Sequence, residues 1–228
     1  MNLSETIFAQ LKTDIIQGSY PPGSKFPSER ILAERLGVSR VTIRDAVRKL
    51  TQMGLVEKIP HSGTYVCEFE SEASLELLVQ IMQTREAVDP RLLESLLEFR
   101  NLAEVFAARQ AASRITPQGA AMLNDIIGGI DDHLAEPAYL SSADYRLHFT
   151  VAHLSGNTII RLLFTSFRPI YRFYTDIFYS LPDTAAQSMA FHRELVRAVI
   201  AGNSDLAANI MEQALAYART RMTKALGF

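Results

Sequence analysis

The sequence contains a single cysteine, Cys67, among its 228 residues, and it contains no tryptophan. One cysteine excludes an internal disulfide and a zinc site built from cysteines, and this scarcity fits a reducing compartment. The chain also lacks any apolar run near the roughly 18 residues of a membrane span. Its start, MNLSETIFAQLKTD, lacks the basic and apolar parts of a secretory signal. We therefore expect a cytoplasmic protein that does not bind membranes.

A large net charge is also missing, since the formal value at pH 7 is −2. The charge is divided unevenly along the chain. Residues 1–68 hold nine lysines and arginines against seven acidic residues, whereas residues 69–228 hold fourteen against eighteen. A positive front part indicates nucleic-acid binding there, because non-specific DNA affinity depends on the neutralisation of phosphates.

Strand signals are confined to one short stretch, LVEKIPHSGTYVCEF, which predicts two strands joined by a tight turn over residues 60–63. Three helices are expected before it. The first covers residues 4–17, the second begins at a capping serine, Ser28, and ends at Gly37, and Ser39 caps the third. Two helices joined by so short a turn must cross sharply, as in a helix-turn-helix.

From about residue 71 onward the strand signals vanish and helical segments follow one another. Helices are expected over residues 89–114, from 117 onward, from Ser141 or Ser142 to Ser155, over 158–179, over 183–201 and over 204–226. Pro169 predicts that the helix over residues 158–179 is kinked or broken. This rear part therefore reads as an antiparallel helix bundle.

The third helix carries much positive charge for a helix with a buried face. An inward face is predicted at the spacing i, i+3, i+4, i+7 for Ile43, Ala46, Val47 and Leu50. The arginines at 40, 44 and 48 then form a separate outward row. An ordinary solvated face is the alternative, and the row alone does not exclude it.

The stretch GSYPPGSKFPSERILAERLGVSRVTIRDAVRKLTQMGLVEKIPHSGTYV resembles the winged helix-turn-helix of GntR-type bacterial transcription regulators. The pieces PPG, PSER, VSRVTIR, GLV and SGTYV occur in order and at the family's spacing. Farther on, DYRLH, SGN and FHREL resemble the helical, FCD-type effector domain of the FadR-like subfamily. The resemblance implies a mainly α fold with a winged helix-turn-helix in residues 1–68, a linker in 69–74 and an all-α antiparallel bundle for effector binding and dimerisation in 75–228.

The third helix is expected to enter the major groove of double-stranded operator DNA, with its N-terminal turn reaching bases and phosphates. The hairpin tip would follow the neighbouring minor groove, and a residue of the second helix would contact the backbone. The resemblance implies the same positions. The predicted DNA-contacting residues are Arg30, Ser39, Arg40, Thr42, Arg44, Lys49, His61, Ser62 and Gly63. A homodimer is expected, because one short helix reads few base pairs and a two-fold pair doubles the contact.

Asp144 and His148 are four residues apart on one predicted helix face, and His192 lies on another helix among apolar residues. A carboxylate and imidazoles that converge from neighbouring helices are a common metal site, although a lone histidine is more often a satisfied core residue. The resemblance implies one divalent metal, such as zinc, nickel or manganese, held by an Asp and a His on one helix and two later His. Ala214 stands where the last His is expected. A metal completed by water or effector, and a metal-free acyl-CoA pocket, therefore both stay open.

Two other histidines are not expected to bind the metal. His153 lies about 180° around its helix from Asp144, so it should face away from any site that Asp144 enters. His133 follows two aspartates near a helix end and is expected at the surface. The predicted ligand set is therefore Asp144, His148 and His192 alone.

Arg100 resembles an arginine of such effector domains that faces the pocket. A buried arginine requires an anion, and a carboxylate effector would supply one. An ion pair with Glu104 or Glu94 on its own helix is the alternative. Tyr171 and Tyr174 lie in the aromatic stretch FRPIYRFYTDIFY, which could line the rest of the pocket.

The predicted function is a ligand-responsive, homodimeric regulator that binds a pseudo-palindromic operator and is not an enzyme. A small organic acid is the expected effector, with acyl-CoA as the alternative. A metallohydrolase fused to a DNA-binding domain is a further alternative, because three ligands with an open position resemble a hydrolytic zinc site. No separate general base accompanies those ligands in the sequence.

Overall fold

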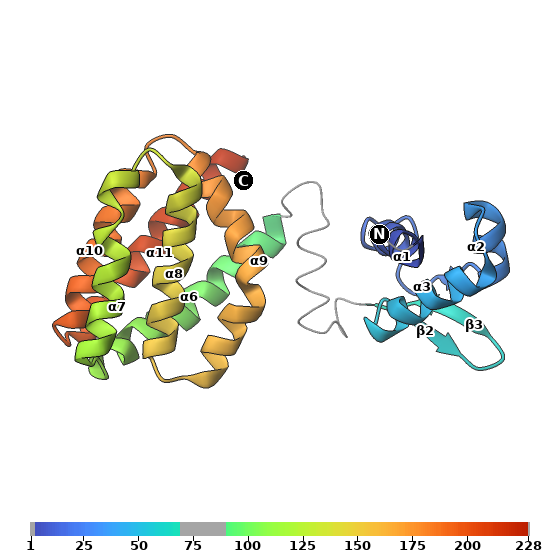
Figure 1. Ribbon diagram of the computed structural model, residues 1–228, viewed down its shortest axis with the longest axis horizontal. Helices are drawn as coiled ribbons and strands as arrows, with labels where there is room; N and C mark the ends of the chain where they lie inside the picture. The colour runs from blue at the N-terminus through green and yellow to red at the C-terminus, as the bar shows by residue number, and fades with distance from the viewer. Residues whose placement is uncertain (1–2, 69–89, 228) are drawn as a thin grey trace. The chain divides into compact units, whose positions relative to one another are not determined.

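The computed structural model describes residues 3–68 and 90–227 (Figure 1). The chain divides into two compact units, Met1–Ala87 and Val88–Phe228, which are described separately. The linker expected over residues 69–74 lies outside the described residues. No described helix is both long and apolar enough to cross a membrane.

The N-terminal unit is a helix-turn-helix followed by a β-hairpin. Its elements are α1 (Leu3–Ile16), β1 (Lys25–Phe26), α2 (Glu29–Leu36), α3 (Arg40–Gln52), β2 (Val56–Ile59) and β3 (Gly63–Val66). The three strands form one antiparallel sheet in the order β1-β3-β2, with Tyr65 paired to Lys25 on one side and to Glu57 on the other. The hairpin β2–β3 lies beside α3 and forms the wing.

Local signals in the sequence determine where α2 and α3 begin and end. The hydroxyl of Ser28 accepts a hydrogen bond from the backbone N–H of Ile31, and that of Ser39 accepts from Thr42, so both serines cap a helix N-terminus. Gly37 ends α2 in the left-handed conformation, at a φ of 66°. The predicted helix-turn-helix is confirmed.

One apolar core holds the N-terminal unit together. Its fully buried side chains come from α1, α2, α3 and the start of the wing, and they include Leu11, Ile15, Leu32, Ile43, Leu50 and Leu55. Because α3 contributes its buried side chains to this core along one face, its other face is left on the surface of the unit.

The C-terminal unit is helical throughout its described residues. It consists of α6 (Pro90–Ser113), α7 (Pro117–Gly128), a short 3₁₀ turn (Asp131–His133), α8 (Pro137–Leu154), α9 (Thr158–Ser180), α10 (Ala185–Ile200) and α11 (Ser204–Leu226). In Figure 1, α7, α8 and α9 lie side by side, with α6, α10 and α11 behind them. Buried side chains between these layers, among them Leu147, Leu195, Val199 and Met211, form the core.

Two helix boundaries differ from the prediction. The helix expected to begin at Ser141 or Ser142 begins at Pro137, because a proline at the first helical position loses no hydrogen bond. Of the two outcomes expected at Pro169, a kinked or a broken helix, the broken helix is wrong, because α9 runs through Pro169 as one helix. Pro169 lies on the exposed side, while Ile170, Tyr171 and Tyr174 are buried against the bundle, and this packing stabilises the helix around the proline.

Candidate DNA-binding face and buried metal-ligand cluster

The exposed face of α3 is basic. Ile43, Ala46 and Leu50 are fully buried, whereas the arginines at 40, 44 and 48 are exposed, as the helical pattern predicts. Val41 is also on this face, and 74% of it is exposed. Leu50, nine residues farther on, lies about 180° around the helix from Val41, so Val41 points directly away from the core.

Most of these charges form weak pairs on the surface of the N-terminal unit. Nε of Arg44 lies 3.1 Å from Oε2 of Glu29, and Arg48 pairs with Asp45. Arg30, on α2, pairs with Glu34 at 2.9 Å. No ion pair holds Arg40 within residues 3–68. Because exposed ion pairs contribute little stability, phosphate oxygens could replace these carboxylates at small cost.

Lys49 differs from the arginines. Its ammonium group is mostly covered and contacts the carboxylates of Glu5 and Asp45. The contact with Glu5 links α3 to α1. These contacts raise the pKa of Lys49, with the hydrogen bond to Glu5 as the main cause. Of the predicted DNA-contacting residues, Lys49 is therefore the one most engaged within the unit.

The hairpin tip presents His61, Ser62 and Gly63 at the surface. His61 has a φ of 61° and Gly63 a φ of 141°, so the turn depends on left-handed backbone at both positions. A Cβ at Gly63 would also lie 2.8 Å from Cε of Lys25. The hydroxyls of Ser62 and Tyr65 are hydrogen-bonded at 2.7 Å and tie the tip to β3.

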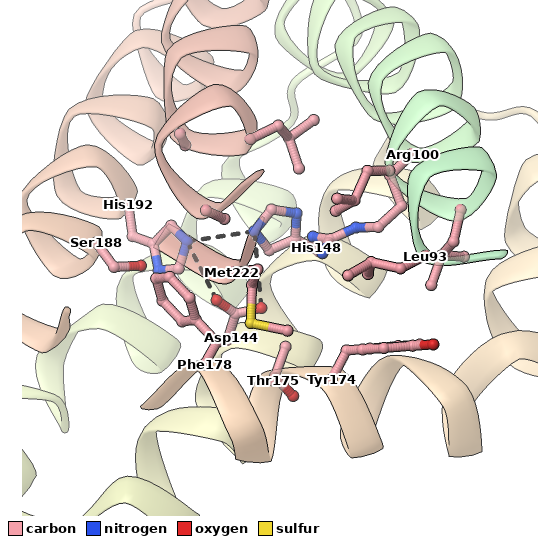
Figure 2. A pocket seen from close by; sticks show the side chains of 15 residues that line it. Leu93, Arg100, Asp144, His148, Tyr174, Thr175, Phe178, Ser188, His192 and Met222 are labelled. Atoms are coloured by element: carbon pink, nitrogen blue, oxygen red, sulfur yellow. Dashed lines mark hydrogen bonds and ion pairs between the residues drawn. The ribbon is translucent and has the colours of Figure 1, made fainter. Parts of the chain in front are cut away.

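In the C-terminal unit, the structure brings Asp144 and His148 of α8 together with His192 of α10. One ligand atom from each lies within 4.8 Å of the others, and all three side chains are buried. Nε2 of His148 and Nε2 of His192 are 3.2 Å apart, and Nε2 of His192 is 3.5 Å from Oδ2 of Asp144. Figure 2 shows both imidazoles pointing toward one another and toward Asp144.

The electrostatics of this cluster suit a cation. Burial opposes the ionisation of Asp144, but His148, His192 and Arg100 outweigh it and hold its pKa below the ordinary value. Burial lowers the pKa of His192 to about 4, so this imidazole is neutral at pH 7 and its lone pair is free to ligate. Neutral imidazoles with a carboxylate suit zinc, nickel or manganese.

One nitrogen of the cluster lacks a partner. Nδ1 of His192 is buried and has no hydrogen bond to any described residue. The ring orientation directs Nε2 at Asp144 and His148 and leaves Nδ1 without a hydrogen bond. An unsatisfied buried nitrogen is more typical of a functional site than of a core histidine, because buried polar atoms normally form hydrogen bonds.

Arg100 contacts both sides of the cluster. Its Nε lies 2.6 Å from Oε1 of Glu104, and a terminal nitrogen donates to the hydroxyl of Tyr171 at 2.8 Å. Tyr171 in turn donates to Asp144 at 2.8 Å. The ion pair expected as the alternative is thus present, and its partner is Glu104; Glu94 instead pairs with Arg219.

A pocket opens beside the three ligands. Arg100 and Tyr174 line it, as does Ala214, and its apolar wall includes Leu93, Leu97, Phe178, Leu215 and Met222. Tyr171, which was also predicted to line the pocket, is not among its lining residues and instead links Arg100 to Asp144. The free space measures about 30 Å³, which is enough for an ion with a water molecule or a small polar group.

Three residues of these sites were missed at the level of the sequence. Val41 gives no signal in the sequence, because a single apolar residue on a basic helix face is common. Glu104 was considered only as a partner of Arg100, and Tyr179, which donates to Asp144 at 2.7 Å, was not considered. The spacing of Arg100 and Glu104 at i, i+4 was the one available signal. The remaining contacts join helices far apart in the chain.

His133 and His153 lie outside the cluster. His153 is exposed near the end of α8. His133 is half-buried, bonds to the carbonyl of Gly129 through Nδ1 at 2.8 Å and stacks on Tyr139. Neither ring points at the three ligands.

Comparison with known proteins covers both units. The family described as "Bacterial regulatory proteins, gntR family" matches residues 3–66, and the "FCD domain" matches residues 95–217. HTH-type transcriptional regulator Mce2R of Mycobacterium tuberculosis is 31% identical over 227 residues, which cover 99% of this chain and 93% of the relative. Fatty acid metabolism regulator protein of Shewanella denitrificans is 30% identical over 191 residues, covering 83% and 77%.

Among solved structures, Streptococcus agalactiae GntR matches with a TM-score of 0.52 and 30% identity, covering 95% of this chain and 99% of that one. The relatives named here are regulators and not enzymes, so the metallohydrolase alternative is wrong.

Proposed function

Because this chain belongs to the GntR family of bacterial regulatory proteins and carries an FCD domain, we propose that its operator affinity is set by a metal-assisted carboxylate site in the helix bundle. In this proposal residues 1–68 bind DNA, residues 69–74 are a linker, and residues 75–228 bind the effector and dimerise. The chain is a DNA-binding transcriptional regulator. The effector, the metal and the dimer are the proposal.

The observation that carries the proposal is the convergence of Asp144, His148 and His192 beside an open pocket. These three residues would hold one divalent cation. A bound cation would supply a Lewis-acidic position that accepts a carboxylate oxygen. Ala214 leaves room next to the ligands, so a small anion could approach them from the pocket. Arg100 lines the same pocket and keeps N–H groups beyond those given to Glu104 and Tyr171.

The DNA half of the proposal rests on the exposed face of α3. Arg40 and Arg44 are placed to fork onto guanines or hold phosphates, and Val41 could pack on a thymine methyl group. The wing tip, with Gly63 free of a side chain, would approach the backbone beside the minor groove. A two-fold dimer would present two such faces to a pseudo-palindromic operator.

A fatty acyl-CoA effector is the second candidate. It is favoured by the relative named fatty acid metabolism regulator protein and by the apolar wall of Leu93, Leu97, Phe178 and Met222. The small free space favours a short carboxylate instead, because an acyl chain would require several of these side chains to move. Two imidazoles and a carboxylate are also ligands for a divalent cation, whereas an acyl chain forms no favourable contact with them.

Calorimetry on the full chain tests the proposal. Metal-free protein is titrated first with zinc, nickel or manganese, and the loaded protein then with a panel of short carboxylates and acyl-CoAs. We expect uptake near one metal equivalent and binding of a short carboxylate only after loading. Uptake below a tenth of an equivalent, together with tight acyl-CoA binding, would select the second candidate.

A further inference from the structure

Glu104 is a buried carboxylate, and glutamate side chains are rarely buried in proteins. It lies on α6 and is only 1% exposed. Buried acidic side chains persist when they are paired, and Glu104 has two partners: Arg100 on its own helix and Nδ1 of His148 on α8. Nε of Arg100 lies 2.6 Å from Oε1 of Glu104, and a guanidinium in a protein is always charged. Glu104 is therefore an ionised acceptor.

An ionised carboxylate cannot donate a hydrogen bond, so its contact with Nδ1 of His148 requires the proton to be on that nitrogen. The tautomer of a neutral imidazole is fixed in this way by the hydrogen bond that one of its nitrogens makes. With Nδ1 protonated, Nε2 carries the lone pair. Nε2 is the atom that faces Nε2 of His192 and, at 3.9 Å, Oδ1 of Asp144.

We propose that Glu104 is a positioning residue that holds His148 in the Nδ1–H tautomer and thereby presents Nε2 to a divalent cation. The inference deepens the proposed function and rests on it. Glu104 itself does not reach the cluster as a ligand; it acts through His148. Partners of this kind typically change metal affinity by about 10- to 100-fold when removed.

The same network orients a second ligand. Arg100 holds Glu104 through Nε, and its guanidinium lies 4.3 Å from the centre of the Tyr171 ring while donating to the Tyr171 hydroxyl. That hydroxyl donates to Asp144. Arg100 is thus connected to His148 through Glu104 and to Asp144 through Tyr171. One buried arginine therefore holds the two side chains that orient His148 and Asp144.

Charge gives Glu104 a second effect on the cation. The buried network holds one guanidinium, that of Arg100, and two carboxylates, those of Glu104 and Asp144. The second carboxylate adds negative charge close to the ligands, which favours a divalent cation. Replacing Glu104 by glutamine removes that charge and substitutes a weaker acceptor of nearly the same shape.

The experiment uses the full chain with ¹⁵N-labelled histidine. In metal-free wild type, two-bond ¹⁵N–¹H spectra report which nitrogen of each of the five histidines is protonated, and a His148→Gln spectrum assigns the signal of interest. We expect a proton on Nδ1 of His148, and a shift toward the mixed or Nε2–H form in Glu104→Gln. A proton on Nε2 in wild type would overturn the proposal without the need for any variant.

Metal titration of the same proteins provides the second readout. Glu104→Gln should bind zinc, nickel or manganese about 10- to 100-fold more weakly than wild type. The matched control is Glu98→Gln, which removes an exposed carboxylate from the same helix and should leave affinity unchanged. Equal affinities in wild type and Glu104→Gln would overturn the proposal. If wild type takes up no metal but His148 carries the proton on Nδ1, the metal site fails while the positioning of the imidazole by Glu104 stands.

Discussion

The two units use charged side chains in opposite ways. On α3 the arginines at 40, 44 and 48 are exposed, and where they are paired the partners are exposed or half-buried carboxylates. In the bundle, Glu104, Asp144 and the two cluster histidines are buried and connected through Arg100 and Tyr171. Surface pairs exchange readily for phosphate, whereas a buried network keeps one geometry because each broken contact leaves an uncompensated group.

This difference teaches where each unit is vulnerable. A substitution on the exposed face should change DNA affinity and leave the fold intact. A substitution in the buried network should change ligand geometry and, through lost compensation, stability as well.

The largest effect is expected at a ligand itself. Asp144→Asn keeps the shape of the side chain but removes the only anionic ligand, so metal affinity should fall by more than the roughly 100-fold that an outer partner can cost. Isothermal calorimetry with zinc measures it. His153→Gln, an exposed position on the same helix, is the control and should bind as wild type does. Full uptake by Asp144→Asn would place the metal elsewhere.

On the exposed face, Arg40→Ala should weaken operator binding by about 1–3 kcal/mol, or roughly 5- to 150-fold. Fluorescence anisotropy with a duplex selected from a random pool by the wild-type chain measures the loss. If Arg40 reads a base, its loss should also relax sequence preference at one position. If Arg40 contacts a phosphate, its loss should instead reduce the dependence of operator affinity on salt concentration. Arg109→Ala, on the surface of the bundle, is the control. If Arg40→Ala and Arg44→Ala both bind as wild type, α3 does not enter the groove.

A smaller effect is expected at Val41. Val41→Ala removes two carbons, each worth about 0.8 kcal/mol when fully buried, so partial burial against a thymine methyl group should be worth about 1 kcal/mol. The matched change in DNA replaces single thymines by uracils, which lack the methyl group. At the contacted position, uracil should weaken wild type several-fold and leave Val41→Ala unaffected. Additive losses at every thymine would show that Val41 contacts no methyl group.

The smallest effect is a pH dependence in the N-terminal unit. A hydrogen bond from Ser4, with further contributions from Arg48 and Lys49, lowers the pKa of Asp45 to about 2. Because the folded pKa is depressed, its stabilising contribution is present above pH 3.8 and is lost as the pH falls toward about 2. Asp45→Asn should remove this pH dependence of the free energy of unfolding, which is measured by denaturation followed at the amides of α3. Glu57→Gln, on the wing, is the control. An unchanged slope in Asp45→Asn would assign the effect to another group.

Much of the fold could be predicted from the sequence because its signals are local. Ser28, Gly37 and Ser39 mark the helix-turn-helix within a dozen residues, and each is confirmed as a helix cap. The start of α8 was misplaced because two serines offered a cap while Pro137 also fits a first turn. Pro169 does not break α9, because the packing of this helix on the bundle outweighs one missing hydrogen bond, and this packing is not visible in the sequence.

The site was predictable only where its contacts repeat along one helix. Asp144 and His148 share a face at i, i+4, so their pairing could be expected. The contact between Glu104 and His148 spans 44 residues and depends on how α6 packs against α8, which no local pattern encodes. Tyr171 was predicted only as part of the pocket lining and Tyr179 had no predicted role, and only the packed structure reveals that both hydroxyls donate to Asp144.

We propose that occupancy of the buried cluster changes the DNA affinity of the exposed face of α3. Operator affinity of the full chain, measured with and without metal and the best-binding carboxylate, tests it most directly in wild type and in Asp144→Asn. A ligand shifts this equilibrium only by its differential affinity for the two DNA-binding states. We predict a several-fold change in operator Kd for wild type and none for Asp144→Asn. An equal change in both proteins, or none in either, would contradict the account.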